Sequence, residues 1–431
     1  MRRSMLTLAA ILPLTLTGLV GPAGTLAVDG NTVPTGSAEG LLAALARVPD
    51  SPAARQNVVS YLDQRAVAAA RPGAARPGSI ADVEALLASD DPSARLWLAA
   101  MQGVGSGDPE LVQRMATAAR WPSELGFDLL DVHQHLVFGL PPSDGSVLAG
   151  SFDPEAVAAA FAERGYTPSA VGGRTLLCGV SGCGDGMRSD IAKADGGLPF
   201  GAQLGRSEPI AVSEADILSS ADLETLTAML EAVDGKAPSL ADDPAYRAIA
   251  TAADPETMLI QATLLPGGML GLGPEIYGFF TDSPEDAGRL VVELDELFEP
   301  MPAADVIGIF DGATPTEQVV TIVLAYADDA DAALAAEVLP RRLEVLPTLS
   351  AGTLSDLLAE RGVTRVIGRV VPSGHGAAAA AVIELRAPLA GPDPGAEGGP
   401  PSPSSRLYRL LVDLVFRRDL LWLVPVLPLE H

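Results

Sequence analysis

The order of secondary structure expected along the chain repeats once, and this repeat constrains the fold more than any other feature of the 431 residues. Over residues 58–178, the hydrophobic patterns give the order strand, helix, strand, strand, helix, hairpin. Residues 257–387 give the same order, from the strand TMLIQATLL to a hairpin that turns at PSGHG. A shared order is typical of two related structural units. We therefore expect an α+β fold with two related halves of antiparallel sheet with helices.

The remaining segments extend or connect these two halves. Residues 179–256 hold glycine-rich sequence followed by apolar-periodic sequence, and EADILSSADLETLTAMLEAV within them is expected to be helical. The expected segments outside the halves are a signal peptide at 1–27, a leader and first helix at 28–57, Gly-rich loops and a helical connector at 179–256, a Pro/Gly/Ser linker at 388–405, and an amphipathic C-terminal segment at 406–431.

The N-terminus has the pattern of an export signal. Arg2 and Arg3 precede an uncharged run rich in Leu and Ala that reaches Val28, and Thr25 and Ala27 stand at the −3 and −1 positions of a cleavage site. An uncleaved anchor stays open because the uncharged run is long enough to span a bilayer. RRSML also resembles a twin-arginine signal, so the export route stays open. Under each alternative, the rest of the protein lies outside the cytoplasm, either secreted or associated with the cell envelope.

The chain is strongly acidic. It has 55 Asp and Glu against 28 Lys and Arg, a net charge of −27, which argues against nucleic-acid binding because phosphate backbones require a basic surface. Several acids stand directly before proline, as in Asp153-Pro154 and Asp243-Pro244. An N-cap acid followed by proline in the first turn is a helix start. We therefore interpret these acids as helix caps and not as calcium ligands.

Cys178 and Cys183 are the only two cysteines, separated by GVSG. In an exported protein an isolated pair most simply forms a disulfide, and the glycines allow so short a loop to close. Free thiols are an alternative. A redox-active pair is more often C-x-x-C, and a zinc site would need two more ligands. The spacing favours a structural disulfide.

Asp131, His133 and His135 form the run DVHQH. On a β-strand all three side chains would point to one face, because side chains alternate. That face would offer three metal ligands, or two ligands and an orienting acid, as in a metal-dependent hydrolase. The competing interpretation is the solvated polar face of an amphipathic strand. Apart from a divalent metal under the first interpretation, we expect no cofactor.

No serine or cysteine nucleophile stands out. GVSGC lacks the final glycine of G-x-S-x-G, and Ser373 and His375 share a turn too short for a catalytic pair to face each other. The sequence therefore favours a non-enzymatic role over catalysis.

The C-terminal segment combines a polar stripe with apolar residues. Arg406, Arg409, Asp413 and Arg417 recur on one side of an otherwise apolar helix, and Trp422 follows. One interpretation is an interfacial helix on an anionic membrane, with Arg406, Arg409 and Arg417 toward the lipid and Trp422 at headgroup depth. The helix can instead dock on the protein's own core, or contact a partner protein. The sequence leaves these alternatives open.

The run from Gly150 to Tyr166, GSFDPEAVAAAFAERGY, resembles a segment of uncharacterised exported or lipoprotein-like proteins of GC-rich bacteria. There, G-x-F-D opens a helix and G-Y closes it. The resemblance implies an extracytoplasmic location and no established activity. No cysteine lies near the cleavage region, so lipoprotein anchoring does not carry over. We expect an exported cell-envelope protein with a binding or structural role; the alternatives are a metal-dependent hydrolase and a membrane-peripheral protein.

Overall fold

The fold was analysed in a computed structural model of the chain. The residues that the structure describes are 35–70, 76–88, 114–270, 283, 285, 289, 292, 301–346, 348, 353–374, 376–389, 405–417, 419, 422 and 423. The expected signal peptide, most of the 388–405 linker, and His375 lie outside the described residues.

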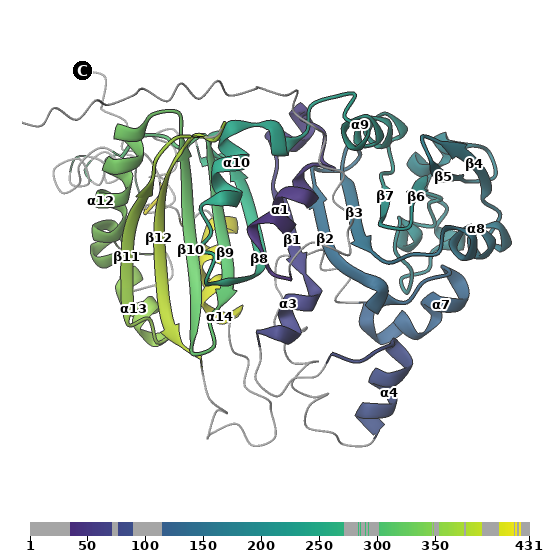
Figure 1. Ribbon diagram of the computed structural model, residues 1–431, viewed down its shortest axis with the longest axis horizontal. Coiled ribbons are helices and arrows are strands. Elements are labelled where there is room, and N and C mark those ends of the chain that lie inside the picture. The colour runs from purple at the N-terminus through teal and green to yellow at the C-terminus, as the bar shows by residue number, and fades with distance from the viewer. Residues whose placement is uncertain are drawn as a thin grey trace, which may run out of the picture.

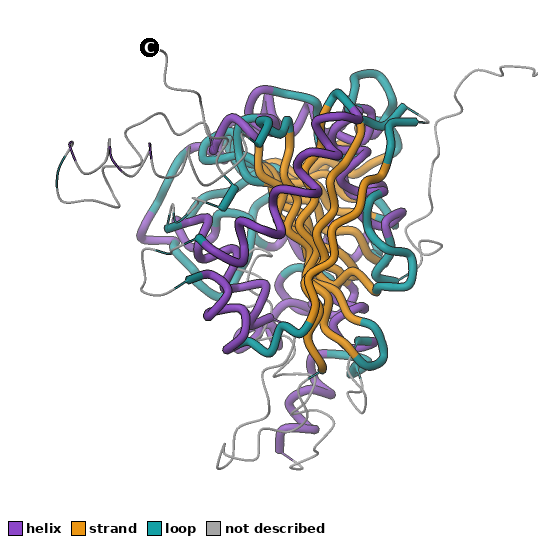
Figure 2. Tube along the Cα trace, turned by 90° about the vertical axis from the view of Figure 1, so that its left-hand side faces the viewer, coloured by secondary structure: helices purple, strands orange, loops and turns teal. Residues whose placement is uncertain are grey.

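The described strands form one antiparallel sheet, in the order β11-β12-β10-β9-β8-β1-β2-β3-β7-β6-β5-β4 (Figure 1). Figure 2 shows the strands stacked behind one another as one continuous layer. The strands are β1 (Val59–Asp63), β2 (Val132–Phe138), β3 (Gly145–Gly150), β4 (Thr167–Val171), β5 (Arg174–Cys178), β6 (Ile210–Val212), β7 (Asp216–Ser219), β8 (Met258–Pro266), β9 (Val306–Ala313), β10 (Glu317–Tyr326), β11 (Arg365–Val371) and β12 (Ala379–Pro388).

Helices cover both faces of this sheet. The longer described helices are α1 (Ala38–Leu45), α3 (Gln64–Ala69), α4 (Ile80–Ala88), α8 (Pro154–Glu163), α9 (Leu223–Val233), α10 (Pro244–Thr251), α12 (Asp329–Val345), α13 (Leu354–Glu360) and α14 (Ser405–Phe416). Two one-turn helices, α2 (Pro52–Arg55) and α7 (Trp121–Glu124), also lie in the described part. No helix in that part is long and apolar enough to cross a membrane.

The two expected halves meet in the middle of the sheet. Their first strands, β1 and β8, pair antiparallel, with Val59 opposite Leu264 and Leu62 opposite Gln261. From this seam β2 and β3 run outward on one side, and β9 and β10 on the other. Each half ends in a hairpin, β4–β5 or β11–β12. The α+β fold is therefore confirmed, and the observed strand order follows the repeat seen in the sequence.

The halves differ by one additional pair of strands. In the second half β12 pairs directly with β10, whereas in the first half β7 and β6 stand between β3 and β5. These strands lie in residues 179–256, which were expected to hold only loops and helices. That expectation was wrong for Asp216–Ser219, which is β7; the helix begins only at Leu223, capped by Asp222. All residues of β6 and β7 are buried, so neither shows the alternation that marks a half-exposed strand.

Three clusters of buried apolar side chains pack between the sheet and the helices that cover it. On the face turned to the viewer in Figure 1, Tyr61, Phe138 and Phe310 pack with α1, α9 and α10. On the opposite face, one cluster joins the first half to α3, α7 and α8, and another joins the second half to α12, α13 and α14. Local signals explain the helix starts: Asp153 and Asp243 cap α8 and α10 as predicted, each before a proline.

Candidate functional site

Asp131, His133 and His135 do not share one strand face. Asp131 ends a short 3-10 helix, η2 (Leu129–Asp131), and β2 begins only at Val132. The pairing of β2 with β3 then shifts between Val132 and Gln134, which places His133 at a β-bulge. The alternation on which the three-ligand arrangement depended is therefore interrupted twice.

The environments of Asp131 and His133 also differ. The Asp131 carboxylate accepts a hydrogen bond from the Asp128 main-chain amide at 2.7 Å, and burial raises the pKa of Asp131. Burial, followed by the charges of Arg65 and Arg76, lowers the pKa of His133 to about 4. His133 is therefore a neutral imidazole near neutral pH, close enough to two guanidinium groups to be affected by both.

His135 is buried and bonded within the sheet. Its Nε2 lies 3.0 Å from Ser146 Oγ on β3, and burial lowers the pKa of His135 to about 3. A serine beside a histidine is the arrangement of a general-base pair, but a base is effective when its pKa lies near the working pH. Burial makes His135 a weaker base than an ordinary histidine. The contact supports the β2–β3 pairing.

Among the residues that the structure describes, no group of three or more His, Cys, Asp or Glu side chains is arranged to hold a metal ion. Metal binding by Asp131, His133 and His135 stays a prediction, without the shared strand face that motivated it.

A buried carboxylate organises the hydrogen bonding where β1 gives way to α3. The buried Asp63 carboxylate accepts hydrogen bonds from the amides of Gly36, Arg65 and Ala66 at 2.9, 2.9 and 3.1 Å. It also accepts one from Gln134 Nε2 at 3.2 Å. Asp63 thus caps α3 and fixes residue 36 to the sheet, which is a structural role.

Beside Asp63 stand polar groups whose hydrogen bonding is incomplete. Gln64 is 1% exposed, and neither of its amide atoms has a hydrogen-bond partner. Arg76 Nη2 donates to the carbonyl oxygens of Leu130 and Val132, while Arg76 Nε and His133 Nδ1 are buried without partners. We call these residues the β1–α3 junction: Asp63, Gln64, Arg65, Arg76 and His133.

Gln64 and Arg76 were not among the functional residues expected from the sequence. The available signal was the run Asp63-Gln64-Arg65 directly after an apolar strand. Arg76 is distant in sequence, and no local pattern marks it. Buried polar groups in native proteins nearly always have partners, so this concentration requires an explanation.

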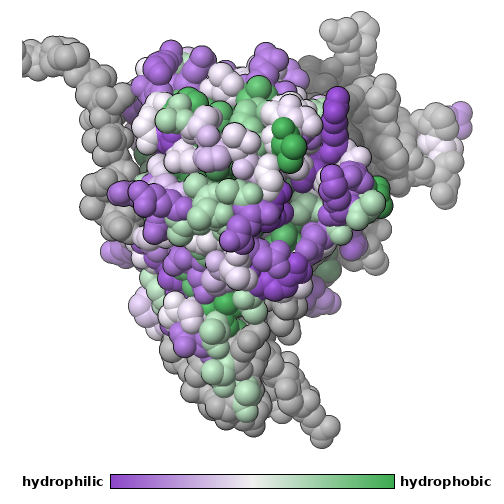
Figure 3. All heavy atoms as spheres, turned by 90° about the vertical axis from the view of Figure 1, so that its right-hand side faces the viewer, coloured by the Kyte–Doolittle hydropathy of each residue, from purple (hydrophilic) through white to green (hydrophobic). Residues whose placement is uncertain are grey.

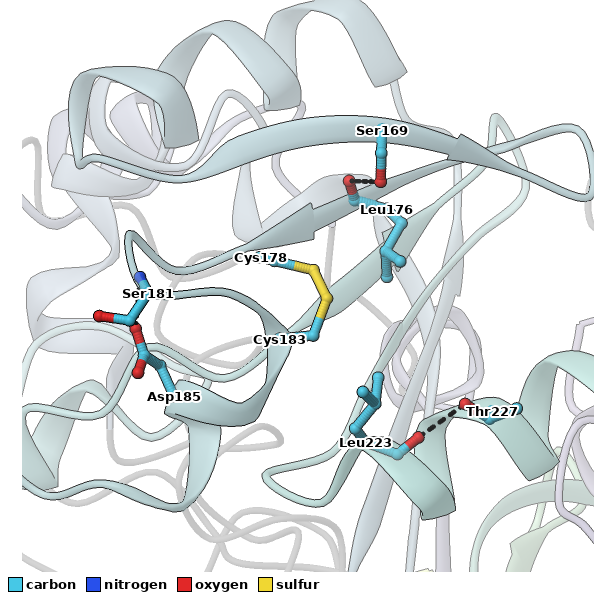
Figure 4. Close-up of a disulfide and its surroundings, with 8 residues drawn as sticks. All are labelled: Ser169, Leu176, Cys178, Ser181, Cys183, Asp185, Leu223 and Thr227. Carbon is cyan, nitrogen blue, oxygen red and sulfur yellow. Dashed lines mark hydrogen bonds between the residues drawn. A yellow bond between two sulfur atoms is a disulfide. The ribbon is translucent and has the colours of Figure 1, made fainter.

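Cys178 and Cys183 form a disulfide, as the spacing predicted (Figure 4). Cys178 ends β5, Cys183 begins the 3-10 helix η3 (Cys183–Met187), and their Cα atoms are 4.5 Å apart, within the usual range. The enclosed turn is closed further by Gly182 N, which donates to Gly179 O at 2.8 Å. The disulfide fixes the start of the segment between β5 and β6, residues 179–209, which we call the β5–β6 loop.

The β5–β6 loop carries apolar side chains on its surface. Val180 is 81% exposed and Ile191 69% exposed, and Met187 and Leu204 are also exposed. The charges among them are paired in sign: Lys193 lies 3.2 Å from Asp190, and Arg188 lies 4.0 Å from Asp185. Figure 3, which shows the end of the molecule that carries β4, β5 and α8, has apolar residues distributed among polar ones.

The C-terminal helix docks on the protein's own sheet. Leu407 and Leu411 of α14 belong to the apolar cluster of the second half, and Tyr408 Oη lies 2.7 Å from Thr263 Oγ1 of β8. Trp422 is 1% exposed and donates to Asp419 O at 3.0 Å.

The outward side of this segment is polar. Arg409 and Arg417 are exposed, and the Arg406 side chain is not among those that the structure describes. The sequence left open whether this helix contacts a membrane, the protein's own core or a partner. The apolar side of α14 packs on the protein's own core, and Trp422 is buried there instead of lying at the surface. Peripheral membrane contact through Arg406, Arg409 and Arg417 stays a prediction.

No model of a protein family matches the chain, and no curated protein sequence matches it. Crystal forms I, III and IV of the Treponema protein TP0453 give structural similarity at TM-scores of 0.32, 0.32 and 0.34, with sequence identities of 8%, 10% and 10%. The matches cover 86%, 89% and 85% of this chain and 96%, 100% and 95% of TP0453. These TM-scores are too low to support a conclusion about fold or function.

Proposed function

We propose that the chain is an extracytoplasmic binding protein of the cell envelope, and that the β5–β6 loop is its contact surface for another protein. The observation that carries the proposal is the exposure of Val180 and Ile191 on a loop whose start is fixed by the Cys178–Cys183 disulfide. Binding residues are commonly presented on loops held by a rigid scaffold, and here the scaffold is the continuous sheet.

The Cys178–Cys183 disulfide supports an extracytoplasmic location. Disulfides persist in oxidising compartments and are rare in the reducing cytosol. The N-terminal pattern of an export signal agrees with this compartment. The resemblance of Gly150–Tyr166 to exported proteins of GC-rich bacteria has the same implication.

The composition of the loop favours a protein partner over an anionic membrane. The loop has four acids and three bases, so it has no excess positive charge to attract lipid headgroups: Asp185, Asp190, Asp195 and Glu208 against Arg188, Lys193 and Arg206. Exposed apolar side chains surrounded by paired charges match the apolar centre and polar rim of a protein interface.

Location and thiol state are tested together. Cells that express the full chain are fractionated, and free thiols are alkylated before and after reduction. We expect the protein in the extracytoplasmic fraction, with both cysteines alkylated only after reduction. Cytosolic protein with both thiols alkylated before reduction would contradict the location.

The contact surface is tested by photo-crosslinking in intact envelopes. A photoreactive residue is placed at Val180 or Ile191 in the loop. The matched control position is Val345, which is 54% exposed at the end of α12 in the other half. We expect the same discrete crosslinked protein from both loop positions and none from position 345. Absence of a crosslink, or identical products from position 345, would overturn the proposed contact surface.

A further inference from the structure

We propose that the chain forms a two-fold symmetric dimer, in which β11 pairs antiparallel with β11 of a second copy about Gly368 and the two α12 helices pack side by side. Strand β11 lies at one end of the sheet, and the β4–β5 hairpin and the β5–β6 loop lie at the other (Figure 1). The proposal therefore does not depend on the function proposed for the β5–β6 loop, which stays free in such a dimer.

The outer strands of the sheet in the described part, β4 and β11, differ in their capacity to pair. Strand β4 has five residues and includes Pro168, which has no amide hydrogen to donate. Strand β11, RVIGRVV, has seven residues, no proline and four β-branched side chains, which favour strands. Figure 2 views the sheet from the β11 side. The outer side of such a strand presents a row of backbone donors and acceptors to another chain.

The charges on β11 do not protect its edge. Charged side chains can oppose edge pairing, but both arginines of this strand are engaged with their own sheet. Arg369 donates from Nε to Glu384 of β12 at 3.3 Å and from Nη2 to the Ala252 carbonyl oxygen at 2.7 Å. Arg365 forms an ion pair with Glu317 of β10, two strands in from the edge. Both guanidinium groups are therefore held over the sheet and not beyond it.

The sequence of β11 is complementary to itself. Antiparallel pairing centred on Gly368 places Val366 opposite Val370 of the second copy, and Ile367 opposite Arg369. By symmetry each contact occurs twice, and it covers Ile367 and Val370, which are each 38% exposed. Facing β-branched side chains stabilise a strand pair, whereas like charges directly opposite destabilise it. A centre shifted by one residue in either direction would set arginine opposite arginine, so the charges select Gly368.

Helix α12 lies over this edge at the centre of the proposed symmetry. It packs on both β11 and β12. Its backbone approaches so closely that a Cβ atom at Gly368 would lie 2.5 Å from the Ala336 carbonyl oxygen and 3.3 Å from Pro340. Because paired strands are about 4.8 Å apart, a helix over β11 and β12 would lie about 10 Å from its symmetry mate. Packed helices have separations of about 8–10 Å, so pairing the strands also brings the helices into contact.

The exposed side of α12 is also complementary to itself. Glu337 and Arg341 follow Ala336 and Pro340 directly in sequence, and their side chains are 60% and 62% exposed. Two helices related by the two-fold axis run antiparallel, which brings Glu337 of one copy toward Arg341 of the other, twice. This charge pattern fits a second copy of the chain better than a partner with one sign of charge.

The association itself is tested by analytical ultracentrifugation of the full chain at physiological ionic strength. At that ionic strength, repulsion between two acidic chains is screened beyond about 8 Å. We expect the mass to rise from one chain to two as the concentration reaches about 100 μM, a weak but specific association. A monomer at every concentration would overturn the proposal.

Edge variants locate the interface. Ile367→Lys sets a lysine opposite Arg369 of the second copy and should raise the dimer dissociation constant by at least about tenfold. The matched control is Val171→Lys, because Val171 is also β-branched, also 38% exposed and lies on the other outer strand. It should leave the dimer unchanged, and circular dichroism checks that both variants fold. A dimer that survives Ile367→Lys, or is lost in Val171→Lys, would contradict pairing through β11.

Charge reversal tests the helix contact without changing the sheet. Glu337→Arg places arginine against Arg341 of the second copy and should raise the dissociation constant by about fivefold. Adding Arg341→Glu restores opposite charges across the two-fold axis and should restore the dimer. A single variant that dimerises like wild type, or a double variant no better than the single, would contradict the packing of the two helices.

Hydrogen exchange tests the strand contact in the unmodified protein. Amides of β11 should exchange more slowly at concentrations where the dimer forms than after dilution, whereas amides of β4 should exchange at the same rate in both. If β11 exchange is equally fast before and after dilution, another surface holds the dimer and the proposal is wrong.

Discussion

The hydroxyl oxygens of Tyr408 and Thr263 lie 2.7 Å apart in the buried interior, which ties the C-terminal helix to a central strand of the sheet. Because a buried hydroxyl left without its partner costs free energy, Tyr408→Phe should lower the free energy of unfolding by about 1 kcal/mol. Urea unfolding at neutral pH measures this loss. Phe416→Ala, at an exposed position of the same helix, is the control and should change stability by less than about 0.5 kcal/mol. Equal losses would show that the hydrogen bond contributes nothing.

The buried Asp216 carboxylate should make stability depend on pH. Burial alone would raise its pKa, but Arg47 at 2.8 Å, Arg174 and Ser213 outweigh burial and hold the pKa of Asp216 below its ordinary value. Its contribution is therefore complete above about pH 4, the unfolded value, and is lost as the pH falls through the folded-state pKa. Asp216→Asn should cost about 3–5 kcal/mol at pH 7, because two partly buried guanidinium groups lose their counterion.

Unfolding of wild type and Asp216→Asn at pH 7 and pH 3 checks this prediction, and the difference between them should shrink at the lower pH. Asp234→Asn breaks an exposed pair with Lys236 and should change stability by less than about 0.5 kcal/mol at either pH. A pH-independent difference for Asp216→Asn would mean that packing, and not charge, explains the loss.

His135 should make the fold sensitive to acid. Burial lowers its pKa to about 3, whereas an unfolded histidine titrates near 6.5. The unfolded chain therefore binds the proton first, and stability falls by about 1.4 kcal/mol for each pH unit below 6.5. His135→Gln should flatten the dependence of the unfolding free energy on pH between pH 6 and 4. His133→Gln should flatten it less, since His133 is only half-buried. If the unfolding free energy of His135→Gln depends on pH as steeply as that of wild type, His135 does not cause the acid sensitivity.

The Cys178–Cys183 disulfide should stabilise the folded chain by about 2 kcal/mol, the loop-entropy value for so short a closure. Replacing both cysteines with serine should lower the urea midpoint accordingly. Reductant should lower the midpoint of wild type by the same amount and leave the double variant unaffected. A double variant as stable as oxidised wild type would show that the disulfide orders the loop without stabilising the fold.

Local signals account for most of what the sequence could predict. Gly172 and Gly173 form the two-residue turn of the β4–β5 hairpin, and both have positive φ angles. Two consecutive glycines between strands predict such a turn, because glycine adopts positive φ without strain. Asp328 directly precedes α12 and caps it by accepting a hydrogen bond from the amide of Ala330. The strands of the two expected halves could be predicted because they carry a clear hydrophobic period or a turn signal.

Features that depend on tertiary contacts were not predictable. The strands β6 and β7 are short and buried throughout, so no periodicity distinguishes them from a helix. His133 was assigned to a regular strand because a bulge leaves no mark in the sequence. Arg76 lies close enough to His133 to lower the pKa of its ring, although the two residues are far apart along the chain.

The seam between β1 and β8 also determines when the protein can finish folding. It pairs positions about 200 residues apart, such as Val59 with Leu264. Pairing over such distances is slow, because closing a long loop costs entropy before the contacts compensate for it. Until synthesis has passed β8, β1 has no β8 to pair with, and the first half of the sheet ends at β1. The first half of the sheet is therefore left with an open strand edge, the kind of edge that pairs with other chains, until β8 covers it.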